Sequence, residues 1–151
     1  SMVVSAGSED GVKENSLVMN GYGLVGIVTE VSSNYSKVIT LLDTTSSVSF
    51  KLSRDSNCKG IITTGTGIKN EEVNRNKGLL QGYMLDSDYD VLPGDSVVTS
   101  GLGLYPKDIV IGEVTKVTED KSKSLKYVVV KPNVNFKSID NVVIVEPRNM
   151  N

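Results

Sequence analysis

Short runs rich in valine, isoleucine, threonine and leucine alternate along this chain with clusters of glycine, asparagine, aspartate and serine. Apolar runs of this length, bounded by turn residues, are typical of β-strands, and many of them at close spacing indicate a barrel or a sandwich. We predict strands over 16–20, 24–32, 36–43, 47–53, 60–64, 78–85, 96–100, 108–118, 125–131 and 141–145. The one candidate helix, 70–77, is polar throughout, and we expect a loop or a single turn there. The pattern therefore predicts an all-β fold.

An internal repeat indicates how these strands are organised. Residues 15–21 (NSLVMNG) resemble 95–101 (DSVVTSG), and 26–31 (GIVTEV) resemble 112–117 (GEVTKV). In each copy a polar turn and a further apolar strand follow. A three-stranded unit cannot cover its own apolar face. Two copies can do so by closing on each other as a pseudo-symmetric six-stranded barrel, which also removes free strand edges.

The repeat leads to a prediction of two small β-barrels, one inserted in the other and six-stranded in the manner of chymotrypsin-like barrels. We expect residues 12–46 plus 92–146 to form the pseudo-symmetric barrel, and 47–91 to form a smaller inserted β-domain. The alternative is two consecutive barrels with a boundary near 86–93, a stretch that is acidic and rich in turn residues. Residues 1–2 resemble the remnant of a tag.

Several glycines are expected to have backbone roles, because a missing side chain permits a bulge or a close approach between strands. These structural glycines are Gly23, Gly26, Gly101 and Gly112. Val28 and Val31 are three residues apart, as are Val114 and Val117. In a flat strand the members of each pair would face opposite sides of the sheet. A bulge between them would turn both toward one core, as barrel curvature commonly requires.

Composition narrows the possible functions. The 151 residues include no histidine, which removes the commonest general base and the commonest metal ligand. A single cysteine, Cys58, cannot form an internal disulfide. The net charge of −2 provides no basic field for nucleic acid or for anionic lipid. No run of 18 apolar residues occurs, so we expect no membrane span within this segment.

The remaining motifs do not form a chemical site. Gly65 and Gly67 lack the third glycine and the following helix of a dinucleotide loop. Asp86, Asp88 and Asp90 have the spacing of a calcium loop but lack its glycine and its terminal glutamate. We predict no catalytic residue, no metal and no cofactor, and no enzyme activity. Two alternatives stay open, a serine hydrolase of the chymotrypsin-like barrel type and a generic β module that binds a ligand or a glycan.

Several fragments, in order, resemble the signature of the MreC family of bacterial rod-shape-determining proteins. The resemblance is carried by GLVGIVTEV at 23–31 with LLD at 41–43, by GDSVVTSG at 94–101 with Tyr105 and Pro106, and by VVIV at 142–145. It covers roughly residues 11–146. Many relatives carry glycines where Leu104, Lys107 and Asp108 lie, so the shape of that loop departs from the family pattern.

The resemblance implies a role and a location. Members of the family are membrane-anchored through one N-terminal helix, followed by a coiled coil and two extracytoplasmic β-barrels, and this segment would be the barrel part. They act as scaffolds of the elongasome, which carries out lateral peptidoglycan synthesis and maintains cell shape. The implied partners are a class B penicillin-binding transpeptidase, MreD, RodA and MreB, the last through the cytoplasmic tail or indirectly, together with self-association.

The second repeat copy contains a loop, residues 102–107, that the first copy lacks. This loop is the leading candidate for contact with a partner. It carries Leu102, Leu104, Tyr105 and Pro106, which repeat symmetry gives no reason to bury. The alternative is that these residues cap the end of the barrel. If they contact a partner, replacing Leu104 and Tyr105 should keep the fold and weaken binding to the cognate transpeptidase.

Overall fold

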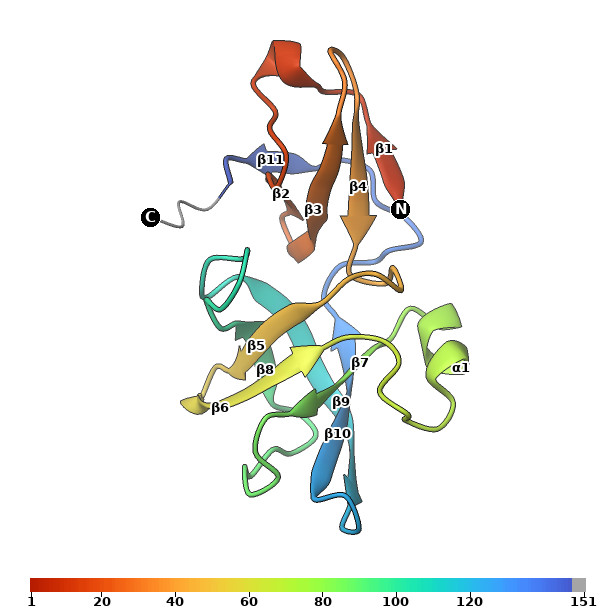
Figure 1. Ribbon diagram of the computed structural model, residues 1–151, viewed down its shortest axis with the longest axis vertical. Helices are drawn as coiled ribbons and strands as arrows, with labels where there is room; N and C mark the ends of the chain where they lie inside the picture. Colours follow the sequence, from red (N-terminus) through yellow and green to blue (C-terminus); the bar gives the residue numbers. More distant parts are fainter. Residues whose placement is uncertain (148–151) are drawn as a thin grey trace.

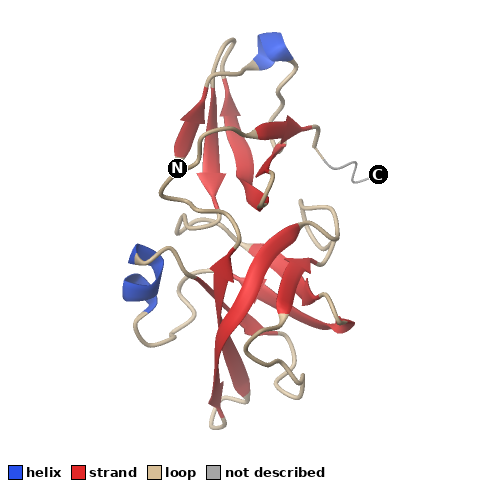
Figure 2. Ribbon diagram, turned by 180° about the vertical axis from the view of Figure 1, so that it is seen from behind, coloured by secondary structure: helices blue, strands red, loops and turns tan. Residues whose placement is uncertain are grey.

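The computed structural model describes residues 1–147 as two β units stacked along the long axis of the molecule (Figure 1). The upper unit is a five-stranded sheet of β1 (Met2–Val4), β2 (Leu17–Asn20), β3 (Gly23–Val31), β4 (Ser36–Thr40) and β11 (Val143–Val145). The lower unit is a closed barrel of β5 (Val48–Leu52), β6 (Asp55–Ile62), β7 (Leu80–Met84), β8 (Ser96–Thr99), β9 (Val110–Asp120) and β10 (Leu125–Pro132). A 3-10 helix (Ser8–Asp10) and the short helix α1 (Glu71–Asn76) lie outside the strands (Figure 2).

The predicted strands are all present, with shifted ends. The largest shift is in β6, which begins at Asp55 rather than at residue 60, because its first three residues are polar. The sequence reasoning missed β1, where Met2 pairs with Val38 at the edge of the sheet, in a stretch attributed in part to a tag. The polar segment 70–77, expected as a loop or a single turn, contains α1, a helix of six residues.

The strand order corrects the predicted domains. Each copy of the repeat lies in its own unit, β2-β3-β4 in the sheet and β8-β9-β10 in the barrel. The predicted barrel from 12–46 plus 92–146 is therefore wrong, and so is a boundary near 86–93, because β7 and β8 belong to the same barrel. The segment predicted as an insert, 47–91, supplies β5, β6 and β7. These three strands complete the barrel that contains the second copy of the repeat. A repeat shows that two segments fold alike and does not show which strands each copy pairs with.

The two units share a strand plan. In the sheet, β1 pairs with β4 and β11 pairs with β2, as β7 pairs with β10 and β5 pairs with β8 in the barrel. The barrel has a sixth strand, β6, which joins β5 to β7 and closes the ring. Within residues 1–147 no strand takes the equivalent place between β1 and β11. The sheet is therefore open, and a second closed barrel is not confirmed.

The predicted bulges are present at matching positions of the two copies. The register shifts between Val28 and Glu30 in β3, and opposite Val114 and Lys116 in β9, so the threonine between them has no partner residue. The Thr29 hydroxyl donates to the Lys37 carbonyl, and that of Thr115 to the Val129 carbonyl. Each bulge turns the two flanking valines toward one cluster, which is Val28 and Val31 in the sheet and Val114 and Val117 in the barrel.

One hydrophobic core joins the two units. Leu24 and Ile27 of β3 pack on the barrel cluster that contains Phe50, Val97 and Ile111. The opposite face of the sheet forms a second cluster of valines. This second cluster comprises Val4, Val12, Val18, Val25, Val28, Val38 and Val134. Residues 23–28 of β3 are buried on both faces, and the sheet is held between its own valine cluster and the end of the barrel.

Three of the predicted glycines allow strands to approach closely. A Cβ at Gly26 would overlap the carbonyl of Ile39, and a Cβ at Gly112 would overlap the carbonyl of Lys131, at matching places in the two copies. A Cβ at Gly23 would press on the carbonyl of Val110, where β3 of the sheet meets β9 of the barrel. These glycines allow neighbouring strands of the sheet and of the barrel to approach closely, and they allow the two units to touch.

We expect Gly112→Ala to destabilise the protein by about 1–3 kcal/mol, because the new methyl group meets backbone of β10 that cannot move without breaking the ladder. Urea unfolding followed by circular dichroism measures the change. The matched control is Gly21→Ala, since a Cβ there meets nothing within 4 Å, and its effect should stay within about 0.5 kcal/mol. Equal stability of the two variants would contradict the close-approach argument.

Candidate protein-interaction site

The segment from Ser100 to Ile109, called here the 100–109 loop, connects β8 to β9 on one side of the molecule, just below the sheet (Figure 1). Its two ends are held together by backbone hydrogen bonds. The Thr99 amide donates to the Ile109 carbonyl at 2.9 Å, and the Asp108 amide donates to the Thr99 carbonyl at 2.9 Å. The loop therefore starts and ends at one fixed point of the barrel.

A buried hydroxyl fastens the loop from inside. The Thr99 side chain has no exposed surface, and its hydroxyl donates to the Pro106 carbonyl at 2.6 Å. The same oxygen accepts from the Ile109 amide at 2.9 Å. Because a buried polar group without a partner is costly, these two bonds fix the return path of the loop.

An ion pair holds the end of the loop that leads into β9. The Lys51 ammonium of β5 lies 2.8 Å from the Asp108 carboxylate, and only 14% of the lysine side chain is exposed. This hydrogen bond lowers the pKa of Asp108 below its ordinary value. Asp108 has a left-handed backbone conformation with φ of 69°, and Gly101 at the start of the loop has φ of 91°. Two tight turns and one ion pair thus define the loop shape.

The structure brings the four candidate contact residues together but does not expose them equally. Tyr105 is only 5% exposed and packs in the core shared by the two units, and its burial raises its pKa to about 12. The burial of Tyr105 agrees with the alternative in which these residues cap the end of the barrel, and leaves its side chain little surface to offer a partner. Leu102 and Leu104 are 48% and 43% exposed, and Pro106 is half-buried. The loop thus caps the barrel with the tyrosine and presents the two leucines outward.

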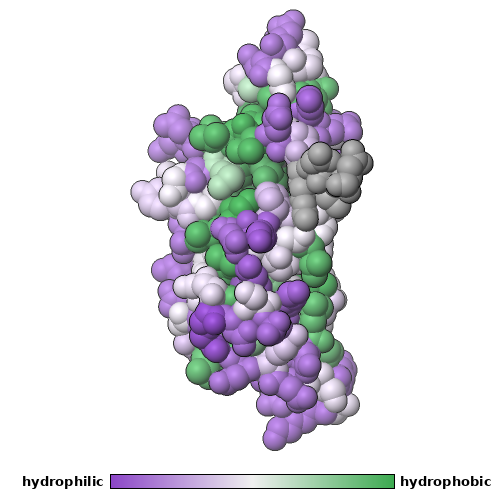
Figure 3. All heavy atoms as spheres, turned by 90° about the vertical axis from the view of Figure 1, so that its left-hand side faces the viewer, coloured by the Kyte–Doolittle hydropathy of each residue, from purple (hydrophilic) through white to green (hydrophobic). Residues whose placement is uncertain are grey.

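Other apolar side chains lie exposed on the same side of the molecule. Val143 and Val145 of β11 pair with Met19 and Leu17, so they continue the sheet face that packs on the barrel. Figure 3 shows this side, with apolar side chains gathered over the sheet and its junction with the barrel. The sequence reasoning identified β11 only as a strand. The available signal was that β11 is apolar at all three positions, so that both of its faces are apolar, and of these residues only Ile144 packs against the valine cluster.

Groups that could bind a metal or react covalently are scarce in the described part of the chain. Among residues 1–147 no group of histidine, cysteine and carboxylate side chains is placed to hold a metal ion. The Cys58 thiol is buried, and its burial raises its pKa. No helix within residues 1–147 is long and apolar enough to cross a bilayer. A closed barrel packed against a related open sheet defines the class of the protein as a β-barrel module.

Comparison with known proteins identifies the family. The family description "Rod shape-determining protein MreC, barrel core" matches residues 1–146. The chain therefore belongs to the MreC family, whose members are structural cell-shape proteins and not enzymes. The cell shape-determining protein MreC of Listeria monocytogenes is 31% identical over 95% of this chain, and that of Streptococcus pneumoniae is 30% identical over 95%. The match covers 47% and 52% of those two relatives, so the chain spans about half of their length.

Solved structures agree with this assignment. A structure of MreC from Pseudomonas aeruginosa is 28% identical, with a TM-score of 0.80 over 95% of this chain and 87% of that chain. A structure described as the major periplasmic domain of the cell shape-determining filament MreC gives a TM-score of 0.76 over 97% of this chain and 85% of that chain, at 29% identity. A complex between PBP2 and MreC from Helicobacter pylori shares the fold, at 20% identity and a TM-score of 0.68 over 91% of this chain and 82% of that chain.

We expect Thr99→Val to destabilise the protein by about 1–3 kcal/mol, because the substitution leaves the Pro106 carbonyl and the Ile109 amide without their buried partner. Hydrogen exchange at Ile109 should accelerate together with the loss in urea stability. Thr118→Val is the control, since this exposed threonine of β9 lies outside the loop. Unchanged exchange at Ile109 would show that the hydroxyl does not hold the loop.

The Lys51–Asp108 pair should make stability depend on pH. Because the pKa of Asp108 is lowered in the folded state, its contribution is complete above the unfolded pKa of about 3.9 and is lost as the pH falls through the folded value. Asp108→Asn keeps a residue that tolerates the left-handed conformation but removes the charge. We expect its thermal midpoint to fall less steeply than the wild type between pH of about 5 and about 2. Asp88→Asn, at an exposed carboxylate outside any ion pair within residues 1–147, should follow the wild-type curve.

Proposed function

We propose that this chain is the extracytoplasmic scaffold part of a membrane-anchored cell-shape protein, which organises lateral peptidoglycan synthesis through protein contacts. Membership of the MreC family supports the role, and the description of one related structure as a periplasmic domain supports the location. The observation that carries the proposal is the 100–109 loop. It is fastened by buried hydrogen bonds and an ion pair and presents two half-exposed leucines.

The proposed partner at this loop is a class B penicillin-binding transpeptidase. The related protein from Helicobacter pylori is described in complex with the penicillin-binding protein PBP2, which supports this partner class. A loop that is already ordered loses little conformational freedom on binding, so apolar contacts to Leu102 and Leu104 translate efficiently into affinity. We propose MreD, RodA and MreB as further members of the same assembly, with MreB reached indirectly or through a cytoplasmic tail.

Self-association is proposed through the open edges of the sheet. Within residues 1–147 the outer edges of β1 and β11 pair with no strand, so each offers backbone groups to a second chain. Both strands have only three residues, which limits the number of such hydrogen bonds. Edge pairing is therefore the weaker contact, and the 100–109 loop is the leading one.

We expect Leu102→Asp combined with Leu104→Asp to weaken binding to the cognate transpeptidase by about tenfold or more, which corresponds to about 1.4 kcal/mol. Surface plasmon resonance with the immobilised transpeptidase measures the affinity, and the thermal midpoint confirms folding. Tyr105 stays unchanged because it belongs to the core.

The control variant is Leu85→Asp combined with Leu92→Asp. These leucines are 50% and 53% exposed, and they lie in the connection between β7 and β8, outside the 100–109 loop. Wild-type affinity of the folded Leu102 and Leu104 variant, or equal weakening by both double variants, would remove the loop from the proposed contact.

A further inference from the structure

The helix α1 lies on the side of the molecule opposite the 100–109 loop (Figures 1 and 2), and two adjoining hollows lie next to it. They meet at Leu79, which lines both. Neither hollow is lined by a carboxylate, although both are lined by cationic side chains. The chain as a whole carries a net charge of −2, so the local excess of positive charge around these hollows does not follow from the overall composition.

The larger hollow is a groove of about 320 Å³ between the turn after α1 and the segment that leaves β10. Lys77, Lys131 and Lys137 line it, and within residues 1–147 none of the three forms an ion pair. Leu79 and Phe136 add apolar surface. A groove of this size, with apolar walls and several cations, suits an elongated anionic ligand.

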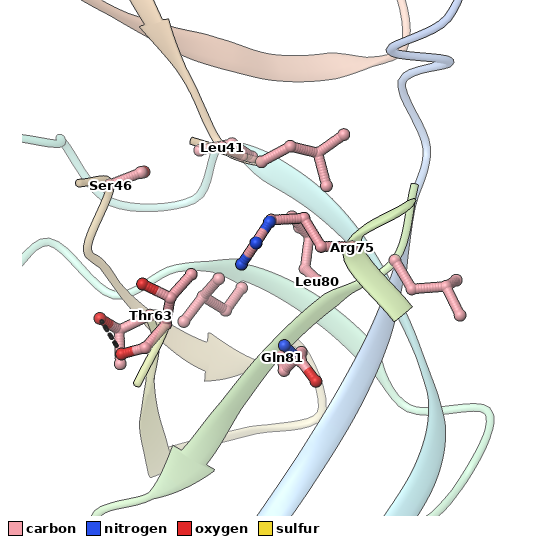
Figure 4. Close-up of a pocket in the computed structure, with 10 residues that line it drawn as sticks. Leu41, Ser46, Thr63, Arg75, Leu80 and Gln81 are labelled. Carbon is pink, nitrogen blue, oxygen red and sulfur yellow. Dashed lines mark hydrogen bonds between the residues drawn. The ribbon is translucent and has the colours of Figure 1, made fainter. Parts of the chain in front are cut away.

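The smaller hollow contains two polar groups that lack partners in the described part of the chain. Figure 4 shows Arg75 reaching from α1 into the space between Leu41, Thr63 and Leu80. Its guanidinium forms no ion pair within residues 1–147, and Glu71 of the same helix accepts instead from the Gly65 amide at 2.6 Å.

Ser46 lines the same hollow and is the second of these groups. It is 8% exposed, and its hydroxyl has no hydrogen-bond partner in the described residues. A buried hydroxyl without a partner is unfavourable, and an incoming acceptor would relieve that cost. The hydroxyl is thus an observation independent of the lysines, and it points to a ligand that accepts hydrogen bonds.

We propose that these two hollows form one binding surface for an acidic peptide segment of a partner protein. One carboxylate pairs with Arg75 at the mouth of the small hollow, with an oxygen close to Ser46. Further carboxylates lie along Lys77, Lys131 and Lys137, and apolar parts of the peptide cover Phe136. The small hollow measures about 10 Å³, room for one oxygen-sized atom, so it admits one oxygen of a carboxylate and no larger group.

This surface does not depend on the contact proposed for the 100–109 loop. The two lie on opposite sides of a body joined by one core, so the protein could hold two partners at once. The leucine variants of the 100–109 loop should therefore bind an acidic peptide like the wild type. That result separates a failure of one proposal from a failure of the other.

Fluorescence anisotropy with a fluorescein-labelled peptide of alternating glutamate and leucine tests the proposal. We expect saturable binding that weakens as salt is raised. Combined Lys77→Gln, Lys131→Gln and Lys137→Gln should weaken binding at least tenfold. Arg75→Gln should weaken it severalfold, and Arg75→Lys should not restore it, because an ammonium cannot form the paired hydrogen bonds of a guanidinium.

The matched control replaces Lys13, Lys121 and Lys123 by glutamine, which removes the same charge outside both hollows. Equal weakening by this control would reduce the effect to net charge and overturn the proposal. Absence of binding by the wild type at low salt would do the same. Equally tight binding of inorganic polyphosphate or of phosphatidylglycerol vesicles, with the same dependence on Arg75, would overturn the assignment to a carboxylate peptide.

Discussion

The packing of β3 on the end of the barrel is the interaction on which the rest of this structure depends. Leu24 and Ile27 extend from the sheet into the cluster around Phe50 and Ile111, and Gly23 lets the two backbones meet at Val110. Protein interiors pack at nearly crystalline density, so such a shared core resists bending between the units. Surfaces on the sheet and on the barrel are consequently held in a fixed relation, which a scaffold requires.

The 100–109 loop extends this rigidity to the surface. Loops are usually the mobile part of a β protein, but here Thr99, Tyr105 and Lys51 each hold it from below. The three anchors differ in kind, as a buried hydroxyl, a buried ring and an ion pair. Together they order the backbone in the absence of a partner, so the binding proposed at Leu102 and Leu104 would have less entropy to overcome.

Much of the local structure could be predicted from the sequence, because it depends on neighbouring residues. The strands follow from apolar runs, and the bulges at Thr29 and Thr115 follow from valines three apart on either side of them. The pairing of the repeat copies could not be predicted, because the pattern of each copy is satisfied equally by the other copy or by β5–β7. Which residues of the 100–109 loop are buried and which are exposed could not be predicted for a related reason. Whether Tyr105 or Leu104 faces inward depends on the three-dimensional path of the loop between the left-handed residues Gly101 and Asp108, which the pattern of apolar residues does not encode.

The shared strand plan explains why the two units need not have the same use. In the barrel, β6 satisfies the edges of β5 and β7, so its backbone groups are occupied and only loops and side chains remain for recognition. In the sheet, no strand within residues 1–147 takes the place of β6, but β1 and β11 are each three residues long. Short edge strands are a common means of limiting unwanted pairing. The short length of β1 and β11 also makes an edge a poor primary contact. It is consistent with a scaffold that recognises partners through side chains on a rigid frame.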